Sequence, residues 1–114
     1  MYRIIACDLD ETLLNNQGAI SDRNLHAIQT AQKMGVKFVP ATGRGYSSVG
    51  DLLSRLGLAD MAGEYVISFN GGAITENRNS KLLHFEGLDW DVAQELYRRG
   101  QQYDVCMHVY TKDC

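Results

Sequence analysis

Acidic residues crowd together where an apolar stretch near the start of the chain ends. Ile4–Cys7 runs directly into Asp8, Asp10 and Glu11. Two carboxylates placed two residues apart can divide the work of phosphoryl transfer, because one can attack phosphorus while the other holds or exchanges the proton. Clustered acids repel one another unless a cation joins them, and hard oxygen ligands of this kind suit Mg²⁺. The loop therefore favours a phosphoryl-transfer site with a magnesium ion.

A second polar turn follows the next apolar stretch. Val36–Ala41 leads into Thr42–Arg44. If the two apolar stretches are neighbouring parallel strands, both turns lie at the carboxyl ends of the strands, where open sheets of this kind bind ligands. The Thr42 hydroxyl and backbone N–H groups of the loop could then hold phosphate oxygens.

The pattern of apolar residues predicts the elements that would position these turns. Continuous apolar runs predict buried strands at Tyr2–Cys7, Val36–Ala41 and Tyr65–Phe69. A helix is expected from its N-cap Ser21 to about Met34, and another over Tyr46–Leu56, ended by Gly57. Later elements are a hairpin of Ala73–Thr75 with Leu82–Phe85, a helix capped by Asp89 that continues to about Gln102, and a strand at Asp104–Tyr110. The β-α-β-α-β order predicts an α/β fold with a Rossmann-like parallel sheet.

Composition narrows the class of protein. The chain of 114 residues is 45% hydrophobic and 22% charged, which indicates one folded domain or part of one. Its net charge of −3 and scattered basic residues predict no nucleic-acid partner, and no apolar run is long enough to predict a membrane span. No signal peptide is evident, and the odd number of cysteines indicates reduced thiols, so we expect a cytoplasmic location. Cys7 is expected to be buried and Cys114 exposed.

Two other classes of site could begin with such acids. A calcium loop would need Gly where Leu13 stands and an acidic residue where Ala19 stands, so the chain does not fit it. A receiver domain has a similar length and similar acids, but it needs an acceptor Asp at the end of the third strand. This chain has Ser68-Phe69-Asn70 there.

Three segments resemble motifs of the haloacid dehalogenase superfamily, in the form used by its Cof-type phosphatases. Asp8–Leu14 resembles the first motif, Ala41–Arg44 the second, and Ile67–Ala73 the segment at the third strand. The resemblance implies a partial core domain over residues 1–86, with three strands and flanking helices. Residues 87–114 resemble only the opening helix and strand of the group's α/β cap, which implies a truncated cap.

The resemblance also implies roles for individual residues. Asp8 would be the nucleophile that forms an aspartyl-phosphate, and Asp10 the general acid and then the base that activates water. The Asp8 carboxylate and the Asp10 backbone carbonyl would ligate Mg²⁺, Thr42 would bind the phosphoryl group, and Thr12 would support the loop. The other residues expected near the phosphate are Leu9, Gly43, Arg44, Asn70 and Gly71. For Arg44, a surface ion pair at a helix start remains an open alternative.

The chain departs from the pattern of the family in two respects. Glu11 stands where many members have Gly, and we expect it to point to solvent. The third motif of the family, a Lys, and the fourth, an acidic pair, have no counterpart here, since Lys112 falls in the cap part. Because these groups stabilise charge at the phosphate and metal, we expect little or no turnover from this chain alone.

The sequence thus predicts that the chain is related to Mg²⁺-dependent phosphatases that act on small phosphorylated metabolites such as sugar phosphates. A non-catalytic phosphate- or metal-binding module, or a self-associating remnant, is the alternative. In the fold of the family the first strand is central, so Tyr2–Cys7 is expected here to be an open edge. Such an edge would pair with a second copy of the chain, or with the missing C-terminal portion.

Overall fold

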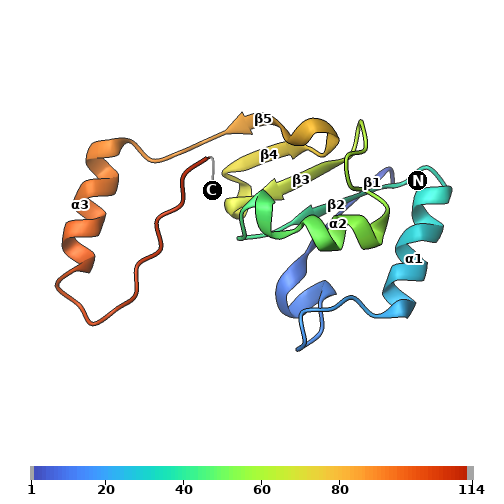
Figure 1. Ribbon diagram of the computed structural model, residues 1–114, viewed down its shortest axis with the longest axis horizontal. Helices are drawn as coiled ribbons and strands as arrows, with labels where there is room; N and C mark the ends of the chain where they lie inside the picture. Colours follow the sequence, from blue (N-terminus) through green and yellow to red (C-terminus); the bar gives the residue numbers. More distant parts are fainter. Residues whose placement is uncertain (1, 113–114) are drawn as a thin grey trace.

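A computed structural model describes residues 2–112, and the predicted exposure of Cys114 lies outside this range. One sheet contains β1 (Ile4–Asp8), β2 (Lys37–Ala41), β3 (Tyr65–Ser68), β4 (Ala73–Glu76) and β5 (Lys81–Phe85) in chain order (Figure 1). The first three strands are parallel, whereas β4 and β5 each run antiparallel to the strand before. The predicted parallel strands and the hairpin are confirmed, and together they make a mixed sheet.

Helices α1 (Asp22–Lys33) and α2 (Gly50–Leu56) lie side by side against the sheet (Figure 1). The predicted N-cap is confirmed, because the Ser21 hydroxyl accepts a hydrogen bond of 3.2 Å from the backbone N–H of Asn24. Gly57 ends α2 in the left-handed region, at φ 71°. The helices, the loop after β1 and the middle strands enclose a core of Leu9, Leu13, Leu14, Ile20, Ile28, Phe38, Val49, Leu53, Leu56, Leu58 and Val66.

The helix predicted over Tyr46–Leu56 is interrupted. A short 3₁₀ turn, Tyr46–Ser48, precedes α2. The Ser48 hydroxyl donates a 2.8 Å hydrogen bond to the carbonyl of Gly45. Such local side-chain bonds compete with the helical backbone pattern, which explains the break.

The first strand is more exposed than its apolar sequence predicts. Ile4 is 59% exposed and Ile5 41% exposed, and Cys7 is half-buried rather than buried. The reason is position, because among residues 2–112 the only strand that pairs with β1 is β2. The expectation of a buried first strand is therefore wrong, and that of an open edge holds for the described residues.

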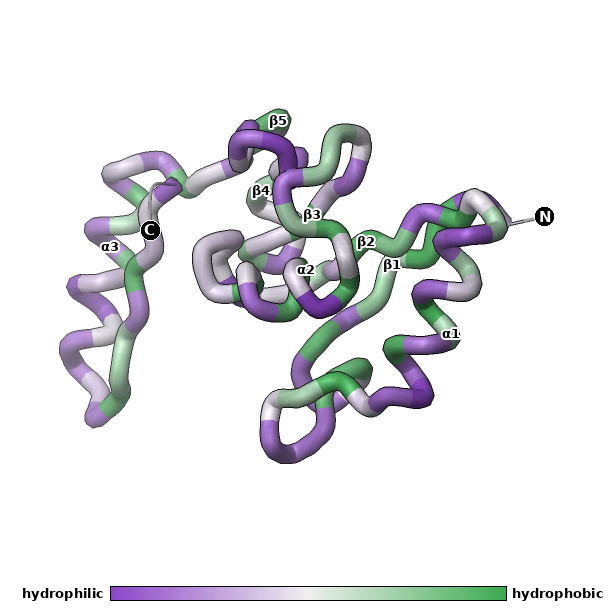
Figure 2. The backbone as a smooth tube through the Cα atoms, turned by 45° about the vertical axis from the view of Figure 1, so that its right-hand side comes forward, coloured by the Kyte–Doolittle hydropathy of each residue, from purple (hydrophilic) through white to green (hydrophobic). Residues whose placement is uncertain are grey.

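Helix α3 (Trp90–Gly100) lies apart from the sheet and has no buried residue, and the segment after it runs back toward the sheet (Figure 1). The surface of α3 bears both hydrophobic and hydrophilic residues (Figure 2). The strand predicted at Asp104–Tyr110 is absent, and these residues are exposed and irregular. An extended segment becomes a strand only by pairing with a neighbouring edge, and within residues 2–112 this segment has no such partner. No helix in the described part of the chain has both the length and the apolar character needed to cross a membrane.

Candidate functional site

The carboxyl ends of the three parallel strands surround a shallow hollow of about 340 Å³. Asp8 ends β1, Thr42 follows β2, and Asn70 and Gly71 follow β3, and all four line the hollow together with Ala41 and Ile67. The pairing of Asp8 with Ala41 and of Ala41 with Ile67 aligns these strand ends. The sheet thus gathers four of the residues that the sequence singled out.

An irregular turn, Leu9–Leu13, follows β1 and contains the acidic residues, and it is closed by a 2.8 Å hydrogen bond from the N–H of Leu14 to the carbonyl of Leu9. The side chains of Leu9 and Leu13 are buried in the core, so only the backbone of Leu9 could contact a phosphate. The Thr12 hydroxyl donates a 2.9 Å hydrogen bond to Asp8 Oδ2.

Glu11 is exposed, as expected, and its backbone is left-handed at φ 59°. This region of φ favours glycine. The conformation therefore gives a physical reason for the Gly that many members of the resembled family have at this position.

Thr42 is held tightly between two loops. It is 4% exposed, and its Oγ1 accepts a 3.1 Å hydrogen bond from the backbone N–H of Arg44. Its own N–H donates to the carbonyl of Ile67 at 2.9 Å, and its carbonyl accepts from Asn70 N–H at 3.0 Å. The Thr42 hydroxyl hydrogen remains to donate to an acceptor in the hollow.

The turn after β3 has an uncommon backbone. Phe69, Asn70 and Gly71 are consecutively left-handed, with φ values of 51°, 55° and 97°. A left-handed Phe is strained, and such strain persists where surrounding contacts hold it. Here the N–H of Phe69 donates to the carbonyl of Arg44 at 3.1 Å. A Cβ on Gly43 would start 3.1 Å from Asn70 Oδ1, so the glycine allows the Asn70 side chain to lie close against the second loop.

Asp10 and Arg44 form an ion pair at one side of the hollow. Arg44 Nε donates to Asp10 Oδ2 at 2.8 Å, and Arg44 Nη2 pairs with Oδ1. The hydrogen bond that Arg44 donates to the Asp10 carboxylate raises the pKa of the Arg44 guanidinium above its usual value. The structure therefore gives Arg44 the ion pair left open by the sequence, and neither residue lines the hollow. The sequence signal for this pair was opposite charges in the turns after two neighbouring strands.

The donors near the hollow suit part of a magnesium shell. Within residues 2–112 no group of three or more His, Cys, Asp or Glu side chains could hold a metal ion. Mg²⁺ often takes only one or two carboxylates and keeps water and substrate oxygens as its other ligands. The exposed Asp8 carboxylate and the Asp10 carbonyl fit that use, whereas Arg44 occupies the Asp10 carboxylate.

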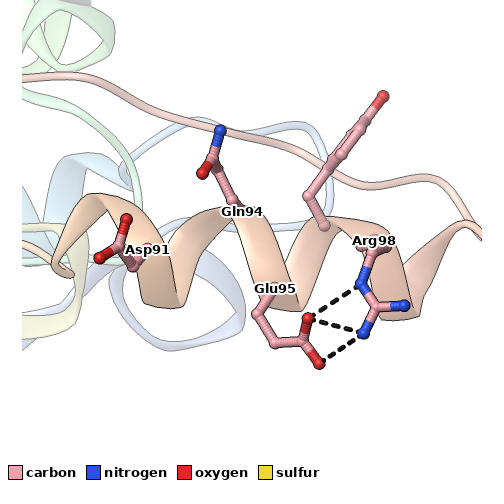
Figure 3. A pocket seen from close by; sticks show the side chains of 5 residues that line it. Asp91, Gln94, Glu95 and Arg98 are labelled. Atoms are coloured by element: carbon pink, nitrogen blue, oxygen red, sulfur yellow. Dashed lines mark hydrogen bonds and ion pairs between the residues drawn. The ribbon is translucent and has the colours of Figure 1, made fainter.

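A second charged hollow, of about 460 Å³, lies beside α3 and contains Asp91, Gln94, Glu95 and Arg98 (Figure 3). Arg98 and Arg99 both donate to the Glu95 carboxylate, at 2.9 and 2.7 Å. The bond from Arg99, and then that from Arg98, lowers the pKa of Glu95. Ion pairs three and four residues apart stabilise an exposed helix. Helix stability therefore explains these charged residues, and no bound ligand is needed to explain them.

Comparisons with known proteins agree with this geometry. The family model for haloacid dehalogenase-like hydrolase matches residues 5–114. Phosphatase YwpJ of Bacillus subtilis is 34% identical over 107 residues, which are 90% of this chain and 36% of that protein. The 5-amino-6-(5-phospho-D-ribitylamino)uracil phosphatase YcsE of the same organism is 35% identical over 96 residues, 79% of this chain and 37% of the relative.

A solved haloacid dehalogenase-like hydrolase from Bacteroides thetaiotaomicron superposes with a TM-score of 0.75 at 29% identity. The match covers 90% of this chain and 38% of that structure. The chain spans about 40% of the length of the curated relatives that it matches. The matched family decides against the receiver-domain alternative. With the family model, the relatives and the strand-end loops all in agreement, this chain belongs to the haloacid dehalogenase-like hydrolases.

Proposed function

We propose that this chain carries part of the site of a Mg²⁺-dependent phosphatase that acts on small phosphorylated metabolites, such as sugar phosphates. The observation that carries the proposal is the meeting of Asp8, Thr42 and Asn70 around one hollow at the ends of parallel strands. A carboxylate nucleophile and hydrogen-bond donors in one place are what transfer of a phosphoryl group requires. The phosphatase names of the relatives support this chemistry.

In the proposed reaction, an Asp8 oxygen attacks phosphorus and the bond from phosphorus to the leaving oxygen breaks. Asp10 gives its proton to that oxygen, which leaves as an alcohol. Water then attacks the phosphorus of the aspartyl-phosphate while Asp10 takes a proton from it, and inorganic phosphate leaves with Asp8 restored. Thr42 and backbone N–H groups would hold the phosphoryl oxygens throughout. Asp10 must leave its pair with Arg44 to carry a proton.

The Asp8 carboxylate and the Asp10 backbone carbonyl would hold Mg²⁺. When bound, the ion offsets the negative charge of the carboxylates and the phosphate. Thr12 would keep Asp8 oriented through their hydrogen bond of 2.9 Å. These roles are what the resemblance of Asp8–Leu14 to the first motif of the family implies, and the exposure of this loop is compatible with them.

Beryllium fluoride tests the proposed nucleophile without requiring turnover, because it binds an aspartate oxygen as a mimic of the phosphoryl group. With Mg²⁺ and the ¹⁵N-labelled chain, it should shift the amide signals of Asp8, Thr42 and Asn70. Asp8→Asn should abolish these shifts, whereas Asp91→Asn, which changes an exposed acid on α3, should leave them unchanged. The same shifts in the Asp8→Asn variant would contradict the proposal.

A non-catalytic binding module is the second candidate. It is favoured by the two-point pairing of Arg44 with the carboxylate of Asp10, the proposed proton carrier. We expect slow or no turnover, because the 114 residues contain no counterpart of the family's later Lys and acidic pair. Release of p-nitrophenolate from p-nitrophenyl phosphate, abolished by Asp8→Asn, would establish catalysis by this chain. Phosphate binding without release would establish the binding module.

We also propose a cytoplasmic location. Cys7 and Cys106 are both free thiols, and thiols persist in reducing compartments. Fractionation of cells that express the native gene would test this directly. Recovery in an extracellular or membrane fraction would contradict it.

A further inference from the structure

A hollow with aromatic walls lies next to the proposed phosphate site. It has a volume of about 310 Å³, and its lining includes Phe69, Phe85 and Tyr110. Asn70 lines both this hollow and the phosphate hollow, and Gly43 beside it directly follows Thr42. A molecule bound by its phosphate at Asp8 and Thr42 could therefore extend into the aromatic hollow.

The aromatic walls come from three separate segments. The C-terminal segment returns to the turn after β3 (Figure 1), where the rings of Phe69 and Tyr110 lie 5.6 Å apart at 44°. Phe85 ends β5 and is 43% exposed. A Cβ on Gly87 would start 2.9 Å from the Phe85 ring, so glycine is needed to keep the ring where it lies. Aromatic surface is thus available on more than one side of the hollow.

We propose that this aromatic hollow holds a planar ring in the leaving group of the substrate, so that the chain prefers aryl or heteroaryl phosphates to aliphatic ones. The inference rests on the proposed phosphate site, and within small phosphorylated metabolites it favours compounds with an aromatic ring over sugar phosphates. Aromatic rings attract further rings in offset or edge-to-face arrangements, which aliphatic groups do not reproduce. Glu86 also lines the hollow, and its carboxylate disfavours a second negative charge on that ring.

The test compares three probes on the ¹⁵N-labelled full chain with Mg²⁺: inorganic phosphate, ethyl phosphate and phenyl phosphate. All three should shift the amides of Thr42 and Asn70. Only phenyl phosphate should also shift those of Phe85, Gly87 and Tyr110, and it should bind about threefold to tenfold tighter than ethyl phosphate.

Phe85→Leu keeps an apolar side chain but removes one aromatic wall, and it should abolish most of this preference. Tyr103→Leu removes an exposed ring that does not line the hollow, and it should leave the preference intact. Inorganic phosphate should bind equally well to both variants.

The outcomes separate this inference from the phosphatase proposal. Equal affinity for ethyl and phenyl phosphate, with Thr42 and Asn70 still responding, overturns the ring hollow and leaves the phosphate site standing. No response to inorganic phosphate contradicts the phosphate site instead. In that case, phenyl phosphate shifts at Phe85 and Tyr110 that vanish in Phe85→Leu would still support the ring hollow, and their absence would overturn it.

Discussion

Asp10 and Arg44 lie 34 residues apart in the sequence, yet their side chains meet because their loops follow neighbouring parallel strands. Both side chains are about half exposed, and exposed pairs of this kind contribute only about 0–1 kcal/mol to stability. The consequence of the pair is therefore positional. It draws the Asp10 carboxylate toward the second loop and leaves Asp8 to line the hollow.

Cys7 offers a prediction at the same scale. Partial burial, and then the neighbouring charge of Asp8, raises the pKa of the Cys7 thiol above its usual value. A raised thiol pKa leaves less of the reactive thiolate at any pH below it, so Cys7 should be alkylated by iodoacetamide several-fold more slowly than the exposed Cys106 at about pH 8.

Mass spectrometry of peptides from a Cys114→Ser background would measure both alkylation rates. Asp8→Asn removes the neighbouring charge and should speed the reaction of Cys7, with Cys106 as the internal reference. Equal rates for the two thiols across the pH range would refute this account of Cys7.

At the scale of elements, two N-cap positions that look alike in the sequence differ in structure. The Ser21 side chain caps α1 through Asn24, whereas Asp89 stands at the start of α3 without a side-chain hydrogen bond to the helix. Residue type alone predicted a cap at both positions. Only the local geometry distinguishes the working cap from the other.

Ser21→Ala should lower the free energy of unfolding by about 1 kcal/mol, because a helix N–H loses its partner. Asp89→Ala is the matched control and should change it much less. Chemical denaturation followed by circular dichroism measures both changes. A larger loss in the Asp89 variant would contradict the assignment of the caps.

At the scale of the whole molecule, the sheet has two uncovered edges within residues 2–112. The β1 edge carries Ile4, Ile5, Ala6 and Cys7 before its one charged residue, Asp8 at the end of the strand, and has no proline, lysine or bulge. The β5 edge instead carries Lys81 and His84, and its neighbour β4 has a register shift at Ile74/Thr75. Charges and bulges protect edges from pairing, so β1 is the edge more suited to associate.

We propose that the chain self-associates through β1. Sedimentation should show a dimer that Ile5→Lys returns to monomer, because a charge on this strand opposes pairing with a second copy. Leu83→Lys on β5 is the matched control and should leave the dimer intact. A monomer at all accessible concentrations, with fast exchange of the β1 amides, would count against association. It would favour the alternative that a further polypeptide segment covers this edge.

Much of the site could be predicted because its residues belong to short patterns that follow strand ends. Asp8 and Thr42 stand at the ends of apolar runs in a β-α-β order, so their convergence could be expected if the two strands were neighbours, which the pairing of β1 with β2 establishes. Residue types also predicted the Ser21 cap and the hairpin of β4 and β5.

Other features depended on partners that no local pattern specifies. The exposure of β1 and the absence of a strand at Asp104–Tyr110 both follow from which edges have a neighbour. Two contacts depend on segments that the fold brings together: the ion pair of Arg44 with Asp10, and the contact of the Phe69 ring with that of Tyr110. The sequence by itself determined the chemistry at the strand ends, because backbone period and residue type act locally. Only the tertiary structure decided which side chains pair or stay exposed, because burial and long-range contact depend on the whole chain at once.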